Sequence, residues 1–145
     1  MRGRRDSQFK KLLVGFDGSP QSEKATESAL ALARSLDAKL VLFAVARPPE
    51  PATIVEVDAM LDDAREYFEG QFKKIVRHAQ DMEVELETVI AVGHPVEQIV
   101  HRAELDQVDL IVLGRRGRSR FEKMLVGSTA EKVLRYAHCP VMVVK

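Results

Sequence analysis

Lys-Leu-Leu-Val-Gly-Phe-Asp-Gly-Ser-Pro, residues 11–20, is the stretch that decides the fold class of this chain. Residues 11–16 form an apolar run of the length of a buried strand, and the next four residues combine a turn with a helix start. Ser19 suits the N-cap position, and Pro20 suits the first helical position because its missing N–H would be unsatisfied there anyway. A strand that leads directly into a helix predicts the first half of a βαβ unit.

The same alternation of strand and helix patterns continues to the end of the chain. Further strands are expected at residues 40–45, 83–92, 108–113 and 141–144, and helices over residues 20–36, over about 54–78, from 95 and from 128. Glu83, Glu85 and Glu87 alternate with less polar residues, which predicts a strand with one solvated face at a sheet edge. The apolar stripes of the second and fourth helices include Ile54 and Leu134, which we expect on buried faces.

These elements predict one α/β domain with five mostly parallel strands and helices on both faces. The 145 residues suffice for one buried core, with residues 1–8 as a basic flexible tail and 9–145 as the domain. Lys plus Arg (22) equals Asp plus Glu (22), so no overall field favours specific nucleic-acid binding or an anionic membrane. No apolar run approaches the roughly 20 residues that cross a bilayer. A single cysteine, Cys139, suits a cytoplasmic location.

The segment after the fourth strand carries the pattern of a phosphate site. Its glycines allow sharp turns and close approach of the backbone to a ligand, and Ser128 and Thr129 offer hydroxyl and N–H groups at a helix start. The segment contains, in order, Gly114, Arg115, Arg116, Gly117, Arg118, Gly127, Ser128 and Thr129. Alternatively, Gly114 simply ends a strand and the arginines belong to a solvated loop. Neither a GxxxxGK[ST] P-loop nor a GxGxxG dinucleotide fingerprint is present.

The spacing Gly114-x2-Gly117-x9-Gly127-Ser128 resembles the nucleotide-binding signature of the universal stress protein family. The segments KKLLVGFDGS, LVLFAV, AVGHPVEQIV, DLIVLGRRG and HCPVMVVK resemble further landmarks of that family in the same order, over nearly the whole chain. The resemblance implies a Rossmann-like fold of the adenine nucleotide alpha hydrolase-like type, with five parallel strands in the order 3-2-1-4-5 between four helices. It also implies an adenine nucleotide as ligand: ATP, or AMP or ADP, with Mg²⁺ as a candidate companion of the phosphates.

The resemblance assigns roles to individual positions. Val45 matches a backbone contact to the adenine, while Gly15 and Asp17 match positions that line the base and the ribose. Gly114 matches a ribose-side glycine, and the phosphate-binding positions correspond to Gly117, Gly127, Ser128 and Thr129. Contact of Arg115, Arg116 and Arg118 with phosphate is inferred from charge alone. Asp17 has an alternative interpretation as a turn residue, because Asp-Gly pairs are common in turns.

The expected function is that of a regulatory stress-response protein switched by nucleotide binding. The pattern supplies no obvious general base or two-carboxylate metal site for phosphoryl transfer, so a dedicated catalytic activity is not expected. The alternative is a slow ATPase or a nucleotidyl-transfer enzyme of the same architecture. The short apolar strand at residues 141–144, together with the resemblance, predicts a homodimer formed through the last strand.

Overall fold

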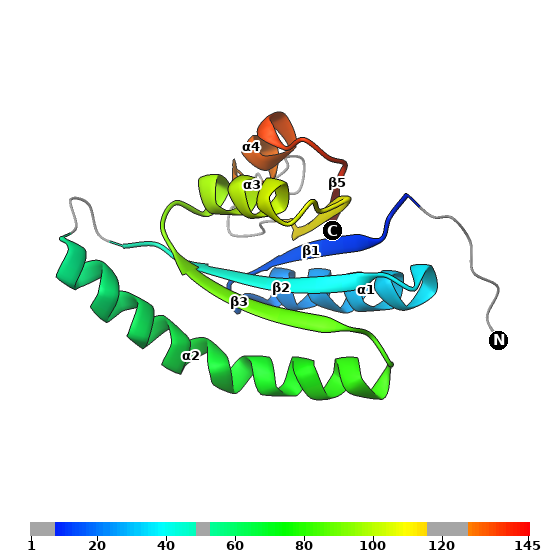
Figure 1. Ribbon diagram of the computed structural model, residues 1–145, viewed down its shortest axis with the longest axis horizontal. Coiled ribbons are helices and arrows are strands. Elements are labelled where there is room, and N and C mark those ends of the chain that lie inside the picture. Colours follow the sequence, from blue (N-terminus) through cyan, green and yellow to red (C-terminus); the bar gives the residue numbers. More distant parts are fainter. Residues whose placement is uncertain (1–7, 49–52, 116–127) are drawn as a thin grey trace.

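The computed structural model describes residues 8–48, 53–115 and 128–145, which form one parallel sheet covered by helices on both faces (Figure 1). The strands are β1 (Lys11–Phe16), β2 (Lys39–Ala46), β3 (Leu86–Val92), β4 (Leu110–Gly114) and β5 (Val141–Val144). The helices are α1 (Pro20–Leu36), α2 (Ile54–Asp81), α3 (Pro95–Leu105) and α4 (Ser128–Tyr136). The sheet order is β3-β2-β1-β4-β5 and every pairing is parallel, so the predicted fold class and strand order 3-2-1-4-5 are confirmed.

β1 occupies the middle of the sheet because its side chains are apolar on both faces. Leu12 and Val14 pack with α1 and α2, whereas Leu13 packs with α3 and α4. All three side chains are fully buried. A strand covered on both faces reads as a continuous apolar run, which is why residues 11–16 predict this position.

The helix starts follow from local capping chemistry. Ser19 is the N-cap of α1, where its hydroxyl accepts a hydrogen bond from the backbone N–H of Ser22 at 3.2 Å, and Pro20 follows as predicted. Thr53 caps α2 in a reciprocal arrangement with Glu56: the Glu56 N–H donates to Thr53 Oγ1 at 3.1 Å and the Thr53 N–H donates to Glu56 Oε2 at 3.3 Å. Each cap satisfies N–H groups that the helix itself leaves unpaired.

Several predicted details are wrong. β3 begins at Leu86 rather than Glu83, because Glu83 adopts a left-handed conformation with φ 58° in the turn after α2. β4 begins at Leu110 rather than Val108. Ile54 is 82% exposed, because the first buried residue of α2 is Ala64 and the turns before it have no core beneath them. Leu134 is 56% exposed, because α4 buries Ala130 and Val133 instead.

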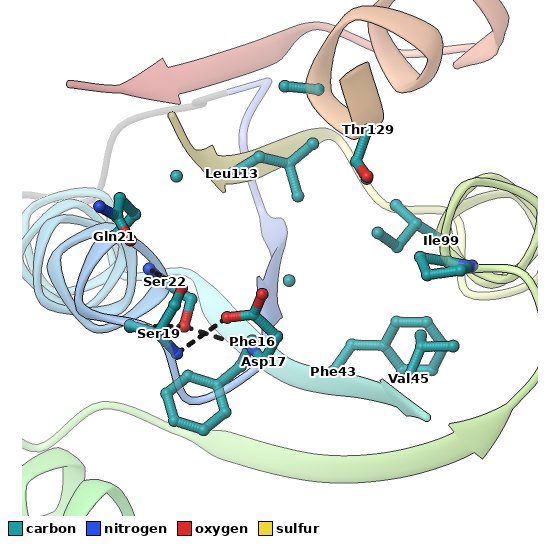
Figure 2. A pocket seen from close by; sticks show the side chains of 14 residues that line it. Phe16, Asp17, Ser19, Gln21, Ser22, Phe43, Val45, Ile99, Leu113 and Thr129 are labelled. Carbon is teal, nitrogen blue, oxygen red and sulfur yellow. Dashed lines mark hydrogen bonds between the residues drawn. The ribbon is translucent and has the colours of Figure 1, made fainter. Parts of the chain in front are cut away.

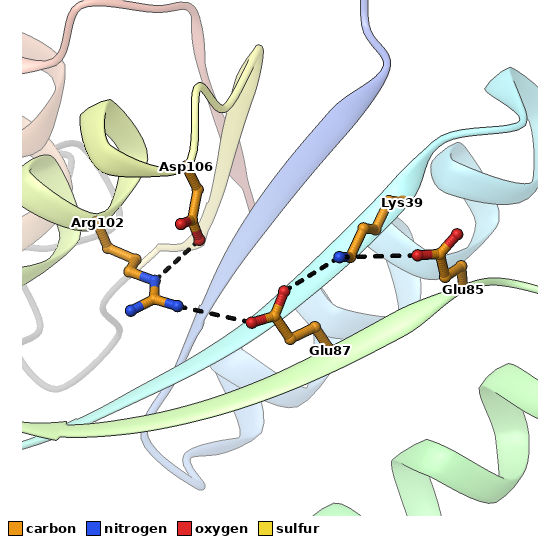
Figure 3. Close-up of polar contacts among 5 residues, drawn as sticks. All are labelled: Lys39, Glu85, Glu87, Arg102 and Asp106. Carbon is orange, nitrogen blue, oxygen red and sulfur yellow. Dashed lines mark hydrogen bonds and ion pairs between the residues drawn. The ribbon is translucent and has the colours of Figure 1, made fainter.

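The two edges of the sheet differ in chemistry. Near the β3 edge, as predicted for an edge strand with a solvated face, Glu87 binds Lys39 Nζ at 3.2 Å and Arg102 Nη2 at 3.6 Å (Figure 3). Glu85 and Asp106 extend this network at 3.7 Å and 2.9 Å. The β5 edge instead consists of four half-buried apolar residues. Charged side chains therefore line one edge, whereas the other presents apolar residues, and no described strand pairs with its outer side.

Of the predicted tail, only Gln8 lies in the described ranges, so the boundary between tail and domain stays a prediction. The helices that the structure describes include none long and apolar enough to cross a bilayer.

Candidate nucleotide site

A cavity of about 160 Å³ opens at the carboxyl ends of β1, β2 and β4 (Figure 2). β1 connects to β2 on one side, while β4 lies on its other side, so the strand order reverses here. In open parallel sheets such a switch point leaves a crevice where ligands bind. The first turns of α1, α3 and α4 all border this cavity, and each brings the positive end of a helix to it.

The inner part of the cavity is an apolar slot. Phe43 and Val45 enter it from β2, Ile99 from α3 and Leu113 from β4. A Cβ at Gly15 would lie 2.7 Å from Leu113 Cδ2 and 3.5 Å from Ile99 Cδ1, so glycine lets these two side chains lie close over the strand, and a larger residue would displace the end of the Leu113 side chain. The cavity holds only about 160 Å³ and these walls are apolar, which suits a flat ring system rather than a whole nucleotide.

The backbone of Val45 adds one hydrogen-bond acceptor to this slot. The Lys39 N–H donates to the Lys10 carbonyl on the β1 side, whereas the Leu40 N–H donates to the Glu85 carbonyl on the β3 side. Successive residues of a strand direct their backbone groups to alternate sides, and Val45 is six residues after Lys39. The Val45 N–H and carbonyl therefore face the β1 side, like those of Lys39. β1 ends at Phe16, opposite Ala44, so the Val45 carbonyl lies past the last residue of β1 and finds no backbone donor in the described ranges.

Asp17 stands at the rim of the cavity, and it serves the turn as well. Its Oδ1 accepts a hydrogen bond from the Ser19 N–H at 2.9 Å, and its own N–H donates to Ser22 Oγ at 3.3 Å. The alternative interpretation as a turn residue is therefore confirmed, and the residue also lines the cavity. The same bonds hold the Asp17 carboxylate in place beside the slot.

Gly114 lines the cavity for a reason that the sequence did not reveal. A Cβ at this position would overlap the carbonyl group of Gln21, with its carbon only 2.7 Å away. β4 also ends at Gly114, as the alternative interpretation expected. The glycine thus lets the first turn of α1 lie directly against the end of β4, which closes the cavity between them.

The α4 end of the site is described only in part. Thr129 lines the cavity and points its hydroxyl toward it, while Ser128 begins the helix outside the lining. Arg115 also lies outside the lining, and its N–H donates to the carbonyl of Val144 at 2.8 Å. The remaining predicted positions fall outside the described residues: Arg116, Gly117, Arg118 and Gly127.

Sequence reasoning missed the apolar walls of the slot. Phe43 lies two residues before Val45, and the period of two on a strand would have placed both on one face. Ile99 lies four residues after Pro95 on the same side of α3, and both line the cavity. The polar residues Ser19, Gln21 and Ser22 of the α1 start were also missed as lining residues.

Two titratable groups in the described ranges have clearly shifted pKa values, and neither lines the cavity. Burial, and next the Asp109 carboxylate, raise the pKa of the Cys139 thiol above its usual value. The hydrogen bond to Glu87 is the main cause that raises the pKa of Lys39. Among these residues no group of three His, Cys, Asp or Glu side chains is placed to hold a metal ion.

Residues 8–145 match the model of the universal stress protein family. The chain belongs to this family.

Other universal stress proteins resemble it over nearly its full length. The universal stress protein MJ0531 of Methanocaldococcus jannaschii is 36% identical over 140 residues, which cover 94% of this chain and 82% of that protein. YxiE of Bacillus subtilis is 35% identical over 147 residues, which cover 94% of this chain and 99% of that protein. A solved universal stress protein in complex with cAMP superposes with a TM-score of 0.76 at 25% identity, covering 96% of this chain and 99% of the other.

Proposed function

We propose that this universal stress protein is a regulatory protein that binds an adenine nucleotide in the cavity at the ends of β1, β2 and β4. The observation that carries the proposal is the apolar slot beside Gly15, which ends at the carbonyl of Val45, for which the described residues supply no backbone donor. The complex of a structural neighbour with cAMP supports the same class of ligand.

The Val45 carbonyl selects between the two purine bases. Adenine carries an amino group at the position where guanine carries an oxygen, and only the amino group can donate to the Val45 carbonyl. Guanine would place one acceptor against another, and leaving an acceptor without a hydrogen bond costs about 1–3 kcal/mol. The proposal therefore includes a preference for adenine over guanine of about fivefold or more.

The sugar and the phosphates extend from the slot toward α1 and α4. Asp17 is placed to accept a hydrogen bond from a ribose hydroxyl at the rim. Thr129 and the start of α4 offer a hydroxyl and the positive end of a helix to the phosphates. Phosphate contacts by Gly117, Gly127 and the arginines, and Mg²⁺ bound with the phosphates, are part of the proposal that the described residues do not test.

The proposal is tested by calorimetric titration of the full chain with ATP, AMP, adenosine and GTP, together with mass spectrometry of any nucleotide released on denaturation. Thr129→Val should weaken binding of ATP more than that of adenosine, because only ATP places phosphates at α4. Thr88→Val makes the same chemical change at an exposed position of β3 and should leave binding unchanged. Absence of binding of any adenine nucleotide at millimolar concentration would contradict the proposal.

The same titrations separate a regulatory protein from an enzyme. Sustained ATP turnover that is lost in both Asp17→Ala and Ser128→Ala would overturn the regulatory assignment in favour of an ATPase or a nucleotidyl-transfer enzyme. Binding without turnover supports regulation by nucleotide.

The proposal also includes a homodimer that forms through β5. This strand is at the sheet edge that lacks the ion-pair network, and all four of its residues are apolar and half-buried. A second copy would pair its backbone and cover that surface. We place the protein in the reducing cytoplasm, because its one cysteine offers no internal disulfide.

A further inference from the structure

A second cavity, larger than the nucleotide site, lies between α1 and α2. Its volume is about 560 Å³, which is within the range of about 300–1,000 Å³ typical of small-molecule sites. We call it the α1–α2 groove; its lining residues are Phe16 from β1, Glu23, Thr26, Glu27 and Leu30 from α1, and Tyr67, Gly70, Gln71, Lys74, Ile75 and His78 from α2. It is separate from the nucleotide cavity and shares only Phe16 with it.

The groove is wider at Gly70 because this residue of α2 has no side chain. Tyr67, Gly70, Gln71, Lys74 and His78 lie on one stripe of α2, at the spacing of three and four residues that aligns side chains on a helix. A Cβ at Gly70 would have no atom within 4 Å, so the packing of the described chain does not require glycine there. Glycine is a poor residue for a helix interior, and its presence on this stripe keeps the groove open where an occupant would approach α2.

The two walls of the groove carry opposite charge. Glu23 and Glu27 lie one turn apart on α1, and Lys74 and His78 lie one turn apart on α2. In the described part of the chain none of these four side chains takes part in an ion pair. Two carboxylates one turn apart on a helix repel each other, and no cationic side chain in the described ranges forms an ion pair with either of them.

The floor between these walls is apolar. Its accessible apolar surface comes from Ile75, which is half-buried, and from the ring of Tyr67, which is 61% exposed. Phe16 and Leu30 also line the groove but are almost fully buried, and the rings of Phe68 and Phe72 pack near Phe16 at centroid distances of 6.2 and 5.8 Å. An occupant therefore meets apolar surface at its centre, carboxylates on one side and basic groups on the other.

We propose that the α1–α2 groove is a second ligand site, which binds short peptides with free termini and an apolar side chain. The terminal ammonium group lies toward Glu23 and Glu27, and the terminal carboxylate lies toward Lys74 and His78. The apolar side chain covers Ile75 and the ring of Tyr67. A simple anion would meet the two carboxylates of α1, and a simple cation would meet Lys74, whereas a zwitterion satisfies both walls at once.

The test is an NMR titration of the ¹⁵N-labelled full chain with the dipeptide Phe-Leu at millimolar concentration, without nucleotide. The expected result is a saturable shift of the backbone amides of Gly70 and Gln71, while the amide of Thr129 in the nucleotide cavity stays in place. N-acetyl-Phe-Leu-amide has the same apolar side chains without terminal charges, and it should bind at least fivefold more weakly. Absence of a saturable shift, or equal binding of the capped peptide, would overturn the proposal.

Matched variants at one position separate binding from folding. Gly70→Leu fills the groove with a side chain and should weaken Phe-Leu binding at least tenfold. Gly70→Ala removes the glycine but adds only one methyl group in open space, and it should bind within twofold of the wild type. Lys74→Gln and Glu27→Gln should each weaken binding severalfold. Equal affinity of the Leu and Ala variants would show that the peptide does not lie in the groove.

Discussion

Gly114→Ala is the substitution that tests the architecture of the nucleotide cavity most directly. The added Cβ would lie 2.7 Å from the carbonyl carbon of Gln21 and closer still to its oxygen, whereas ordinary contacts begin near 3.4 Å. The obstacle is backbone in the first turn of α1, not a side chain that could rotate away. Relief therefore requires α1 or β4 to move by more than roughly 0.7 Å in a close-packed interior, and overpacking of this kind costs about 1–3 kcal/mol.

Gly70→Ala is the matched control, because it makes the same chemical change where nothing lies within 4 Å. In a helix interior this change should stabilise the protein by about 0.5–1 kcal/mol. The two variants should thus differ by about 1.5–4 kcal/mol in the free energy of unfolding, with opposite signs relative to the wild type. For a chain of this size that difference corresponds to roughly 3–16 °C in Tm.

Urea unfolding followed by circular dichroism measures both variants, and equal m-values would confirm that midpoints report stability. Gly114→Ala should also weaken nucleotide binding, since the shift moves the α1 start that carries Asp17 and Ser19 at the cavity rim. A stability of Gly114→Ala equal to or above that of the wild type would refute the reasoning, because it would mean that α1 and β4 do not meet at this glycine.

Three further predictions concern the edges of the sheet and the cysteine. The raised pKa of Lys39 means that its pairing with Glu87 stabilises the fold at neutral pH, and this stabilisation is lost as the pH rises through the lysine range above about pH 10. In Glu87→Gln, the free energy of unfolding in urea should therefore fall less steeply with pH in this range. An unchanged slope of the free energy of unfolding against pH would contradict this. Because burial and Asp109 raise the pKa of Cys139, its thiol should react with iodoacetamide at pH 8 several times more slowly than glutathione does, and faster after Asp109→Asn. Sedimentation at micromolar concentration should show a dimer that Val143→Lys dissociates, and a monomeric wild type would count against pairing through β5.

The sequence predicted those features that depend on neighbouring residues. The Ser19 cap, Pro20 at the first helical position and the buried central strand at residues 11–16 each follow from local chemistry, and the structure confirms all three. The edge position of β3 was predicted from the alternating glutamates at residues 83–87, of which only Glu87 lies within the strand. The strand order, in contrast, came from the resemblance to a family, since periodicity alone does not say which strands pair.

The apolar slot could not be predicted in the same way. Phe43, Ile99 and Leu113 come from three elements far apart in the chain, and only the sheet order brings them to Gly15. The contact of Gly114 with the Gln21 carbonyl has the same origin. The resemblance to a family assigned both glycines to the ligand, whereas in the structure their missing side chains let the protein pack against itself.

Errors at the element ends also have a tertiary cause. The apolar stripe of α2 starts at Ile54, but the first fully buried residue of the helix is Ala64. The periodic pattern correctly indicated an amphipathic helix, but no core packs against its first turns. In α4, Leu134 follows directly after Val133, and a short helix can turn only one of two adjacent residues fully toward the sheet. A sequence pattern shows that a face is apolar but not that another element covers it.

The turn after β1 borders both cavities, and this gives the two proposed sites a physical connection. Gly18 adopts φ 84°, and a Cβ there would lie 2.9 Å from Gln71 Oε1 and 3.5 Å from the Tyr67 hydroxyl, both of which belong to the α1–α2 groove. Asp17, on the other side of the same turn, lines the nucleotide cavity, and Phe16 lines both. A ligand that shifts this turn from one side changes the walls on the other. Linkage then requires that each ligand alter the affinity for the other by the same factor, so coupling through the turn would show as equal shifts in the two dissociation constants.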